Sequence, residues 1–278
     1  MAMDATGTDW RQLTRAERDA AYDNGAAVPD HQDIRERRQA SSAALRAAHP
    51  GSLDIPYGAG ARNRIDLFPA SESSAPCLVF IHGGYWQGGG RNLVSSVTNG
   101  VRAHGWSAAF PGYTLAPDAD MRGIVGEVMA SLDWLREHAA AHGIGGRLLV
   151  AGHSAGGHLA ALAAAHPAVV AAMPVSGVFE LGPVRDTYLD EKLRLSDADM
   201  AEFSPLRRAV VAKPMAIAYG TAELAALLDD SRALHARRAA AHAPGPLLPV
   251  ARANHFNILD TLEQPDGLLT RALLDLLR

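Results

Sequence analysis

The sequence predicts an α/β fold with a mostly parallel central sheet, an antiparallel N-terminal hairpin and helices on both faces. Apolar runs of strand length recur through the chain, and longer helical segments separate them. These runs are continuously apolar, which is typical of parallel strands that are buried on both faces. The 278 residues fit one domain, 1–278, better than two independent ones.

The elements are expected in a simple order along the chain. Residues 1–50 are polar and helical in character, and 53–55 with 64–68 alternate apolar and polar residues as an edge hairpin does. Buried strands are then expected at 77–82, 106–110, 147–151, 169–175, 213–219 and 247–252. Helices are expected near 120–141, 154–165, 224–242 and 265–278. The aperiodic segment 177–210 is either a short cap or a connection with small helices.

The net charge, the apolar stretches and the cysteine content exclude several classes of function. A net charge of −4 argues against a nucleic-acid partner, and the mixed-sign run 35–38 is expected to be a solvated helix face. No apolar stretch reaches the roughly 20 residues that span a bilayer, so we expect no membrane partner and a cytoplasmic protein. Cys77 is the only cysteine and is expected to be a buried thiol. We expect no metal and no cofactor, because no metal-binding motif appears.

The strongest motif is Gly152-His153-Ser154-Ala155-Gly156, which lies between a predicted strand and a predicted helix. In this G-x-S-x-G context the serine sits on a strained turn that raises its hydroxyl above the sheet. The small flanking residues let the strand and the helix approach closely. The helix N-terminus adds partial positive charge where an oxyanion would form. Ser154 is therefore the candidate nucleophile.

A second motif, His82-Gly83-Gly84, follows the first core strand. A glycine loop at this position can bind an oxyanion through free backbone N–H groups, together with the N–H that follows the nucleophile. The expected donors are Gly83, Gly84 and Ala155. His82 is expected to hydrogen-bond the loop, and the glycines 88–90 read as a plain turn.

The base and the acid are expected later in the chain. His255 lies in a short loop after the last predicted strand, where this layout presents its general base. Glu223 follows the strand that ends at Tyr219 and can hold the imidazole in one tautomer. Asp229 and Asp230 are the alternatives for the acid, although both are expected to be solvated positions on the next helix.

Together these residues resemble the arylformamidase (kynurenine formamidase) branch of the α/β hydrolases. The resemblance rests on 82–87, 113–117, 152–159, Glu223 and 254–256, and more loosely on 22–24. It implies a serine hydrolase that cleaves a small acyl, possibly formyl, amide or ester of an aryl compound. A general carboxylesterase for small aryl or alkyl esters is the alternative. A catalytically silent ligand-binding relative is disfavoured because Ser154, Glu223 and His255 are all present.

An aryl leaving group would suit three aromatic side chains near the oxyanion loop, and the expected partner is therefore a small-molecule substrate. Tyr85, Trp86 and Tyr113 are the candidate substrate contacts, since aromatic pairs contribute about 0.5–1.5 kcal/mol beyond burial. Core packing explains the same three residues equally well at this stage.

Overall fold

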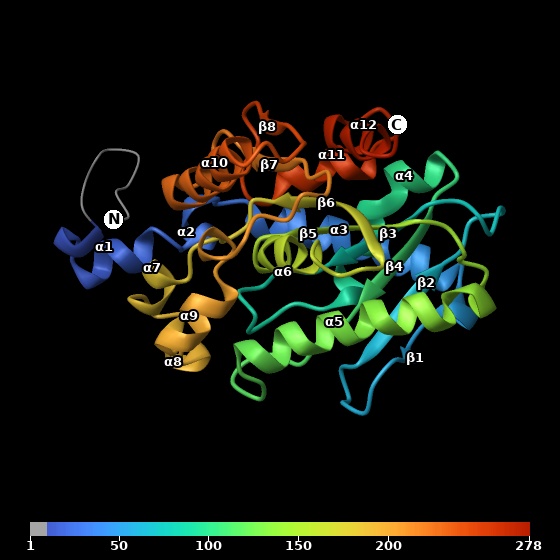
Figure 1. Cartoon of the computed structure of the whole chain (residues 1–278), viewed down its shortest axis with the longest axis horizontal. Helices are drawn as coiled ribbons and strands as arrows, with labels where there is room; N and C mark the ends of the chain where they lie inside the picture. Colours follow the sequence, from blue (N-terminus) through green and yellow to red (C-terminus); the bar gives the residue numbers. More distant parts are fainter. Residues whose placement is uncertain (1–9) are drawn as a thin grey trace.

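A computed structural model describes residues 10–278, which form an eight-stranded sheet flanked by helices (Figure 1). The strands are β1 (Ile55–Pro56), β2 (Arg64–Phe68), β3 (Cys77–Ile81), β4 (Ser107–Pro111), β5 (Leu148–His153), β6 (Val169–Val175), β7 (Ile217–Gly220) and β8 (Leu247–Val250). Their order in the sheet is β1-β2-β4-β3-β5-β6-β7-β8. The β1–β2 and β2–β4 pairs are antiparallel, and the remaining pairs are parallel. The predicted fold class is confirmed.

The apolar runs form the strands because their side chains are buried on both faces of the sheet. Every residue of β3, β4 and β5 is buried. The run predicted to begin at 213 becomes regular strand only at Ile217, and Met215 makes an isolated bridge to Ala172. Pro214 lacks the N–H that a ladder needs, which accounts for the late start. Cys77 is buried as expected, and burial raises the pKa of its thiol to about 12.

Helices cover both faces of the sheet, as predicted. They are α1 (Arg15–Ala20), α2 (Asn24–Ala27), α3 (His31–Ala47), α4 (Asn99–Ala103), α5 (Met121–His138), α6 (Ala155–Ala163), α7 (Gly182–Arg185), α8 (Asp190–Leu193), α9 (Asp197–Phe203), α10 (Ala225–Ala240), α11 (Asp260–Glu263) and α12 (Leu268–Asp275). One apolar cluster joins α5, α6 and α10 to one face of the sheet. A second cluster joins α4, α11 and α12 to the other face.

Helix α3 is tied to the sheet by a buried carboxylate. Asp66 in β2 is fully buried and forms ion pairs with Arg46 of α3 and with Arg91, the latter at 3.1 Å between Nε and Oδ1. Burying a carboxylate is costly unless opposite charges and hydrogen bonds compensate it, and two guanidinium groups do so here. The pairing fixes where α3 lies, and α3 forms one wall of the site described below.

The segment 177–210 consists of short helices and their connections. Its middle part contacts helix α1, because Tyr188 N donates to Asp19 Oδ1 at 2.7 Å. It also contacts the loop after β3, because Gln87 Nε2 donates to Leu189 O at 2.7 Å. In Figure 1, α1 and α2 lie beside α7 at one end of the molecule. The segment therefore contains short helices and reaches the site through Tyr188.

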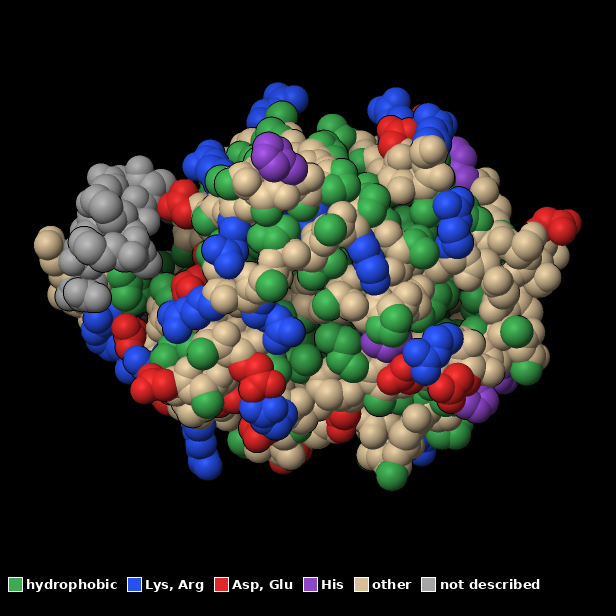
Figure 2. All heavy atoms as spheres, viewed as in Figure 1, with side chains coloured by type: hydrophobic (Ala, Val, Ile, Leu, Met, Phe, Trp, Pro, Cys, Tyr) green, Lys and Arg blue, Asp and Glu red, His purple; other side chains and the backbone are tan. Residues whose placement is uncertain are grey.

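Charges of both signs are interspersed on the face that Figure 2 draws. Among residues 10–278, no helix combines the length and the apolar character that crossing a membrane requires.

Candidate active site

The turn between β5 and α6 has the strained geometry that the sequence predicts. Ser154 stands between His153, the last residue of β5, and Ala155, the first of α6, with φ of 59° and ψ of −123°. A side chain at Gly152 would place its Cβ 2.2 Å from Gly156 O. One at Gly156 would lie 2.0 Å from the carbonyl oxygen of residue 81. The two glycines are therefore needed where the backbones of β3, β5 and α6 meet.

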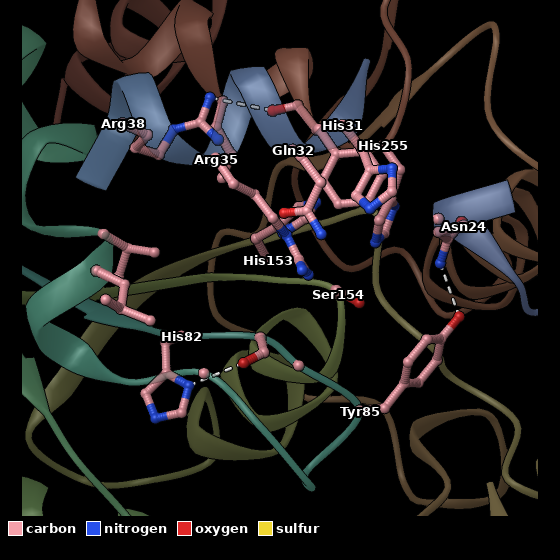
Figure 3. A pocket seen from close by; sticks show the side chains of 18 of the residues that line it. Asn24, His31, Gln32, Arg35, Arg38, His82, Tyr85, His153, Ser154 and His255 are labelled. Atoms are coloured by element: carbon pink, nitrogen blue, oxygen red, sulfur yellow. Dashed lines mark hydrogen bonds between the residues drawn. The ribbon is translucent and has the colours of Figure 1, made fainter. Parts of the chain in front are cut away.

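A cavity of about 530 Å³ opens above this turn (Figure 3). Its floor includes Ser154, which is 4% exposed, and the loop residues Gly83 and Gly84. His153 and His255 also line the cavity, and Figure 3 shows both beside Ser154. The structure thus brings the candidate nucleophile, the candidate base and the candidate oxyanion loop together in one site.

His255 is held by Glu223. The His255 Nδ1–H donates to Glu223 Oε2 at 3.0 Å. The Glu223 side chain is fully buried, and its Oε1 accepts hydrogen bonds from Ser176 Oγ and from Gly220 N, both at 2.6 Å. A carboxylate that accepts a hydrogen bond from Nδ1–H keeps the proton of the neutral imidazole on Nδ1 and leaves the other ring nitrogen, Nε2, free to accept a proton. The arrangement can therefore support general base chemistry in the cavity.

The alternative acids lie elsewhere. Asp230 Oδ2 accepts hydrogen bonds from Phe179 N at 2.5 Å and from Glu180 N at 3.2 Å, so it anchors the start of the segment 177–210. Burial raises the pKa of Asp230 to about 7. The expectation that Asp230 is solvated was wrong, because its partner is the backbone of a segment 50 residues away in sequence. Asp229 lies 3.5 Å from Arg232.

The glycine loop lies directly against the serine turn. A Cβ at Gly83 would meet His153 O at 2.6 Å and Ser154 Cβ at 3.1 Å, and Gly84 has a φ of +116° that other residues rarely adopt. Within residues 10–278, the N–H groups of Gly83, Gly84 and Ala155 donate no backbone or side-chain hydrogen bond. These three donors are free for a ligand, as an oxyanion hole requires.

His82 supports this loop, as predicted. Its Nδ1 lies 2.8 Å from Gly83 O, and its ring stacks on Tyr113 with centroids 4.3 Å apart. Burial lowers the pKa of His82 from 6.5 to about 4, so the imidazole is neutral near pH 7 and Nδ1–H is the donor. The glycines that follow also contribute, because Gly89 has a φ of +83° and a Cβ there would meet Gly83 O at 2.5 Å.

The three aromatic candidates separate into one cavity residue and two core residues. Tyr85 lines the cavity, and its hydroxyl donates to Tyr22 O at 2.6 Å and accepts from Asn24 Nδ2 at 2.7 Å (Figure 3). Trp86 and Tyr113 are fully buried and lie outside the cavity lining. Trp86 Nε1 donates to His158 Nδ1 at 3.2 Å, and Tyr113 donates to His82 O at 2.8 Å. Trp86 and Tyr113 are therefore core residues in this structure.

Sequence reasoning missed the N-terminal wall of the cavity. Helix α3 contributes six lining residues: His31, Gln32, Arg35, Glu36, Arg38 and Gln39. The expectation of a solvated face at 35–38 was wrong for Arg38, which is 6% exposed and is held by Asp260 and Glu263. The only feature of the sequence that pointed to this wall was the loose resemblance at 22–24, since Asp23 and Asn24 also line the cavity.

His153 is a second histidine that the motif alone did not single out. Its ring centroid lies 4.4 Å from that of His255, and its buried Nε2 has no hydrogen-bond partner among the described residues. Burial, and to a smaller extent the neighbouring His255, lower the pKa of His153 well below 6.5. A neutral imidazole therefore stands beside the candidate base. Within residues 10–278, no group of three or more His, Cys, Asp or Glu side chains could hold a metal ion.

Comparisons with known proteins give relatives among the hydrolases. A family model described as BD-FAE matches residues 65–180. A kynurenine formamidase from Danio rerio is 24% identical over 97% of this chain and 99% of its own length. Esterase LipQ from Mycobacterium tuberculosis is 30% identical over 64% of this chain and 46% of its own length. The structure of a candidate thioesterase from Silicibacter sp. TM1040 superposes with a TM-score of 0.82 at 28% identity, covering 93% of this chain and 99% of that one. The sheet order and these relatives show that the chain is a hydrolase with the α/β-hydrolase fold, and its sequence is similar to formamidases and esterases.

Proposed function

We propose that the chain is a serine hydrolase that works through an acyl-enzyme. Ser154 attacks the carbonyl carbon of an amide or ester while His255 Nε2 takes the hydroxyl proton. The N–H groups of Gly83, Gly84 and Ala155 stabilise the oxyanion of the tetrahedral intermediate. His255 then protonates the leaving amine or alcohol, and the C–N or C–O bond breaks. A water molecule repeats these steps on the acyl-enzyme and releases the acid.

One observation carries this proposal: His255, held by the buried Glu223, lines the same cavity as the strained Ser154. Ser154 has φ of 59°, a conformation that non-glycine residues adopt at a cost of about 1–3 kcal/mol. The fold retains that conformation where it exposes the hydroxyl to the cavity. The free N–H groups of the glycine loop lie against the same serine, since a Gly83 Cβ would be 3.1 Å from Ser154 Cβ.

We propose a small acyl group, formyl among the candidates, on an aryl amine or alcohol as the substrate. The kynurenine formamidase of Danio rerio matches nearly the whole chain, which favours an arylformamidase-like activity. Tyr85 and Phe256 provide aromatic surface in the cavity for an aryl leaving group. Esterase LipQ is the more identical relative over a shorter stretch, and it supports the second candidate, a carboxylesterase for small aryl or alkyl esters.

The two candidates separate by substrate preference. We expect a higher kcat/KM on N-formyl-kynurenine than on p-nitrophenyl acetate, with Ser154→Ala inactive on both. A preference for the nitrophenyl ester with negligible deformylation would favour the carboxylesterase. Turnover of either substrate by Ser154→Ala at the wild-type rate would overturn the serine mechanism itself.

A further inference from the structure

We infer that Arg35 binds a carboxylate on the substrate and so selects anionic aryl substrates. The inference rests on the proposed function, because it assigns the substrate class of the same cavity. Arg35 belongs to helix α3 and lines the cavity with Ser154 and His255. Figure 3 shows its side chain extending from α3 toward His153 and Ser154.

The charges around the cavity single out Arg35. Arg38 is the other lining arginine, and it is neutralised by Asp260 Oδ1 at 2.6 Å and Glu263 Oε1 at 2.9 Å. The guanidinium of Arg35, by contrast, forms no ion pair and no hydrogen bond with any residue of the described chain, 10–278, its neighbour Glu36 included. The acidic Asp23 caps α2 by accepting from Ala26 N at 2.9 Å. Arg35 therefore presents an uncompensated positive charge at the cavity.

The contact that Arg35 does make leaves its donors available. Its guanidinium lies over the ring of Phe256, 5.2 Å from the centroid. A guanidinium stacked on an aromatic face keeps its in-plane N–H groups at the edge, where they can form the two parallel bonds that a carboxylate accepts. Phe256 is 7% exposed and follows His255 directly, so it places the charge close to the reacting centre.

The positive charge of Arg35 affects the histidine beside the candidate base. Arg35 is among the groups that lower the pKa of His153, after burial and the charges of His255 and Arg38. An anionic ligand beside Arg35 would offset that field. His153 Nε2 is also buried and without a hydrogen-bond partner in the described chain, and His153 lines the same cavity. The site thus presents polar groups that a ligand would satisfy.

The rest of the wall favours an aryl acid over a small inorganic anion. Leu93, Val94, Phe256 and Leu259 line the same cavity and provide apolar surface for a ring or chain. A ring on this surface with a carboxylate at Arg35 would satisfy both features. Ligand sites commonly combine an apolar lining with a few convergent polar groups in this way.

Matched substrates test the assignment. 3-Carboxyphenyl acetate and 3-carbamoylphenyl acetate differ in charge but hardly in shape, and the corresponding N-formyl anilines extend the pair to amides. Removing a hydrogen bond to a charged group costs about 1.5–3 kcal/mol, so Arg35→Gln should lower kcat/KM for the carboxylates about tenfold to hundredfold. The loss should appear mainly in KM, because the carboxylate contact is made in the ground state as well. Arg35→Lys should retain part of the preference.

A control on the same helix is available. Arg37 pairs with Asp260 at 3.6 Å, is 62% exposed and lies outside the cavity lining, so Arg37→Gln should leave both substrates unchanged. Equal losses on the charged and neutral substrates in Arg35→Gln would show a merely structural role and overturn the inference. Unchanged values on both would overturn it as well.

Binding to an inactive variant separates this inference from the proposed function. Calorimetry with Ser154→Ala should show tighter binding of 3-hydroxybenzoate than of 3-hydroxybenzamide, and Arg35→Gln in that background should abolish the difference. Equal affinities would overturn the inference whatever the reaction is. Turnover that persists in Ser154→Ala would instead overturn the proposed mechanism while leaving the binding result intact.

Discussion

The hydroxyl of Ser176 donates to Oε1 of Glu223 at 2.6 Å, and this contact decides which way the Glu223 carboxylate faces. Gly220 N donates to the same oxygen, so Oε1 is held by two donors while Oε2 accepts a hydrogen bond from His255 Nδ1–H. The two oxygens therefore have different partners although they are chemically equivalent. A glutamine at this position could match these partners in only one orientation, with its amide oxygen facing Ser176 and Gly220.

Glu223→Gln should lower kcat by at least about 10², because the equivalent change in a serine protease triad costs about 10⁴. The amide oxygen would take the place of Oε1, and the amide NH₂ would face His255 Nδ1. That orientation favours the tautomer with a protonated Nε2, which cannot accept the Ser154 proton. Steady-state kinetics on the best available substrate measure the loss, with circular dichroism to check folding.

The matched control for this change is Asp229→Asn, which should keep kcat within about threefold of wild type, because Asp229 lies beside Arg232 and outside the cavity lining. Asp230 is not a suitable control, because it holds the backbone of 179 and 180. A severe loss of kcat in Asp229→Asn together with a mild one in Glu223→Gln would assign the role of the acid to Asp229 of α10.

Gly83→Ala should lower kcat/KM by about 10² or more, because the new Cβ would displace the loop and its N–H groups, and an oxyanion donor that no longer reaches its acceptor costs about 10²–10³. The new Cβ would lie 2.6 Å from His153 O, which is backbone and cannot move without displacing Ser154. Gly88→Ala is the control in the same loop, because its Cβ would meet only Gly84 O at 3.8 Å. Similar activities for the two variants would contradict the oxyanion role of the loop.

Buried histidines should make stability depend on pH below neutrality. His158 Nδ1 accepts from Trp86, and its Nε2 donates to Phe203 O at 2.7 Å, so both ring nitrogens are satisfied in the neutral form. Burial lowers the pKa of His158 from 6.5 to about 4. Between those values the unfolded chain binds a proton that the folded chain does not.

The free energy of unfolding should therefore fall as the pH drops from 6.5 to 4, by at most about 3 kcal/mol for one such histidine. His82 adds to the same trend, since burial lowers its pKa to about 4 as well. Urea denaturation at several pH values measures the slope, and His158→Gln should reduce it. A slope that His158→Gln leaves unchanged would show that His158 does not carry this part of the dependence.

The sequence predicts the sheet well because buried parallel strands leave a strong local signal. The runs at 77–82, 147–151 and 169–175 coincide with β3, β5 and β6 within two residues. The positions of Ser154 and His255 at one cavity could be predicted for a similar reason, since each follows a strand at a point that the fold constrains. The local sequence pattern was therefore enough to predict the position of a residue wherever the strand or helix that contains it, or directly precedes it, fixes that position.

Residues placed by contacts distant in sequence could not be predicted. Trp86 has a φ of 58°, a left-handed turn that directs its ring into the core, and nothing in the local sequence specifies that direction. Asp230 reads as a solvated helix residue until the backbone of 179–180 is placed against it. The cavity wall of α3 depends on the ion pairs of Asp66 with Arg46 and Arg91, which join three separate segments.

The most direct test of the serine mechanism is covalent labelling with a fluorophosphonate probe. Tryptic peptide mass spectrometry should find the wild-type protein modified at Ser154 alone, in stoichiometric yield and with complete loss of activity. Ser154→Ala should fold normally and remain unlabelled, because the change deletes only one hydroxyl. Labelling of another residue, or full activity in Ser154→Ala, would contradict the role of Ser154 as the nucleophile.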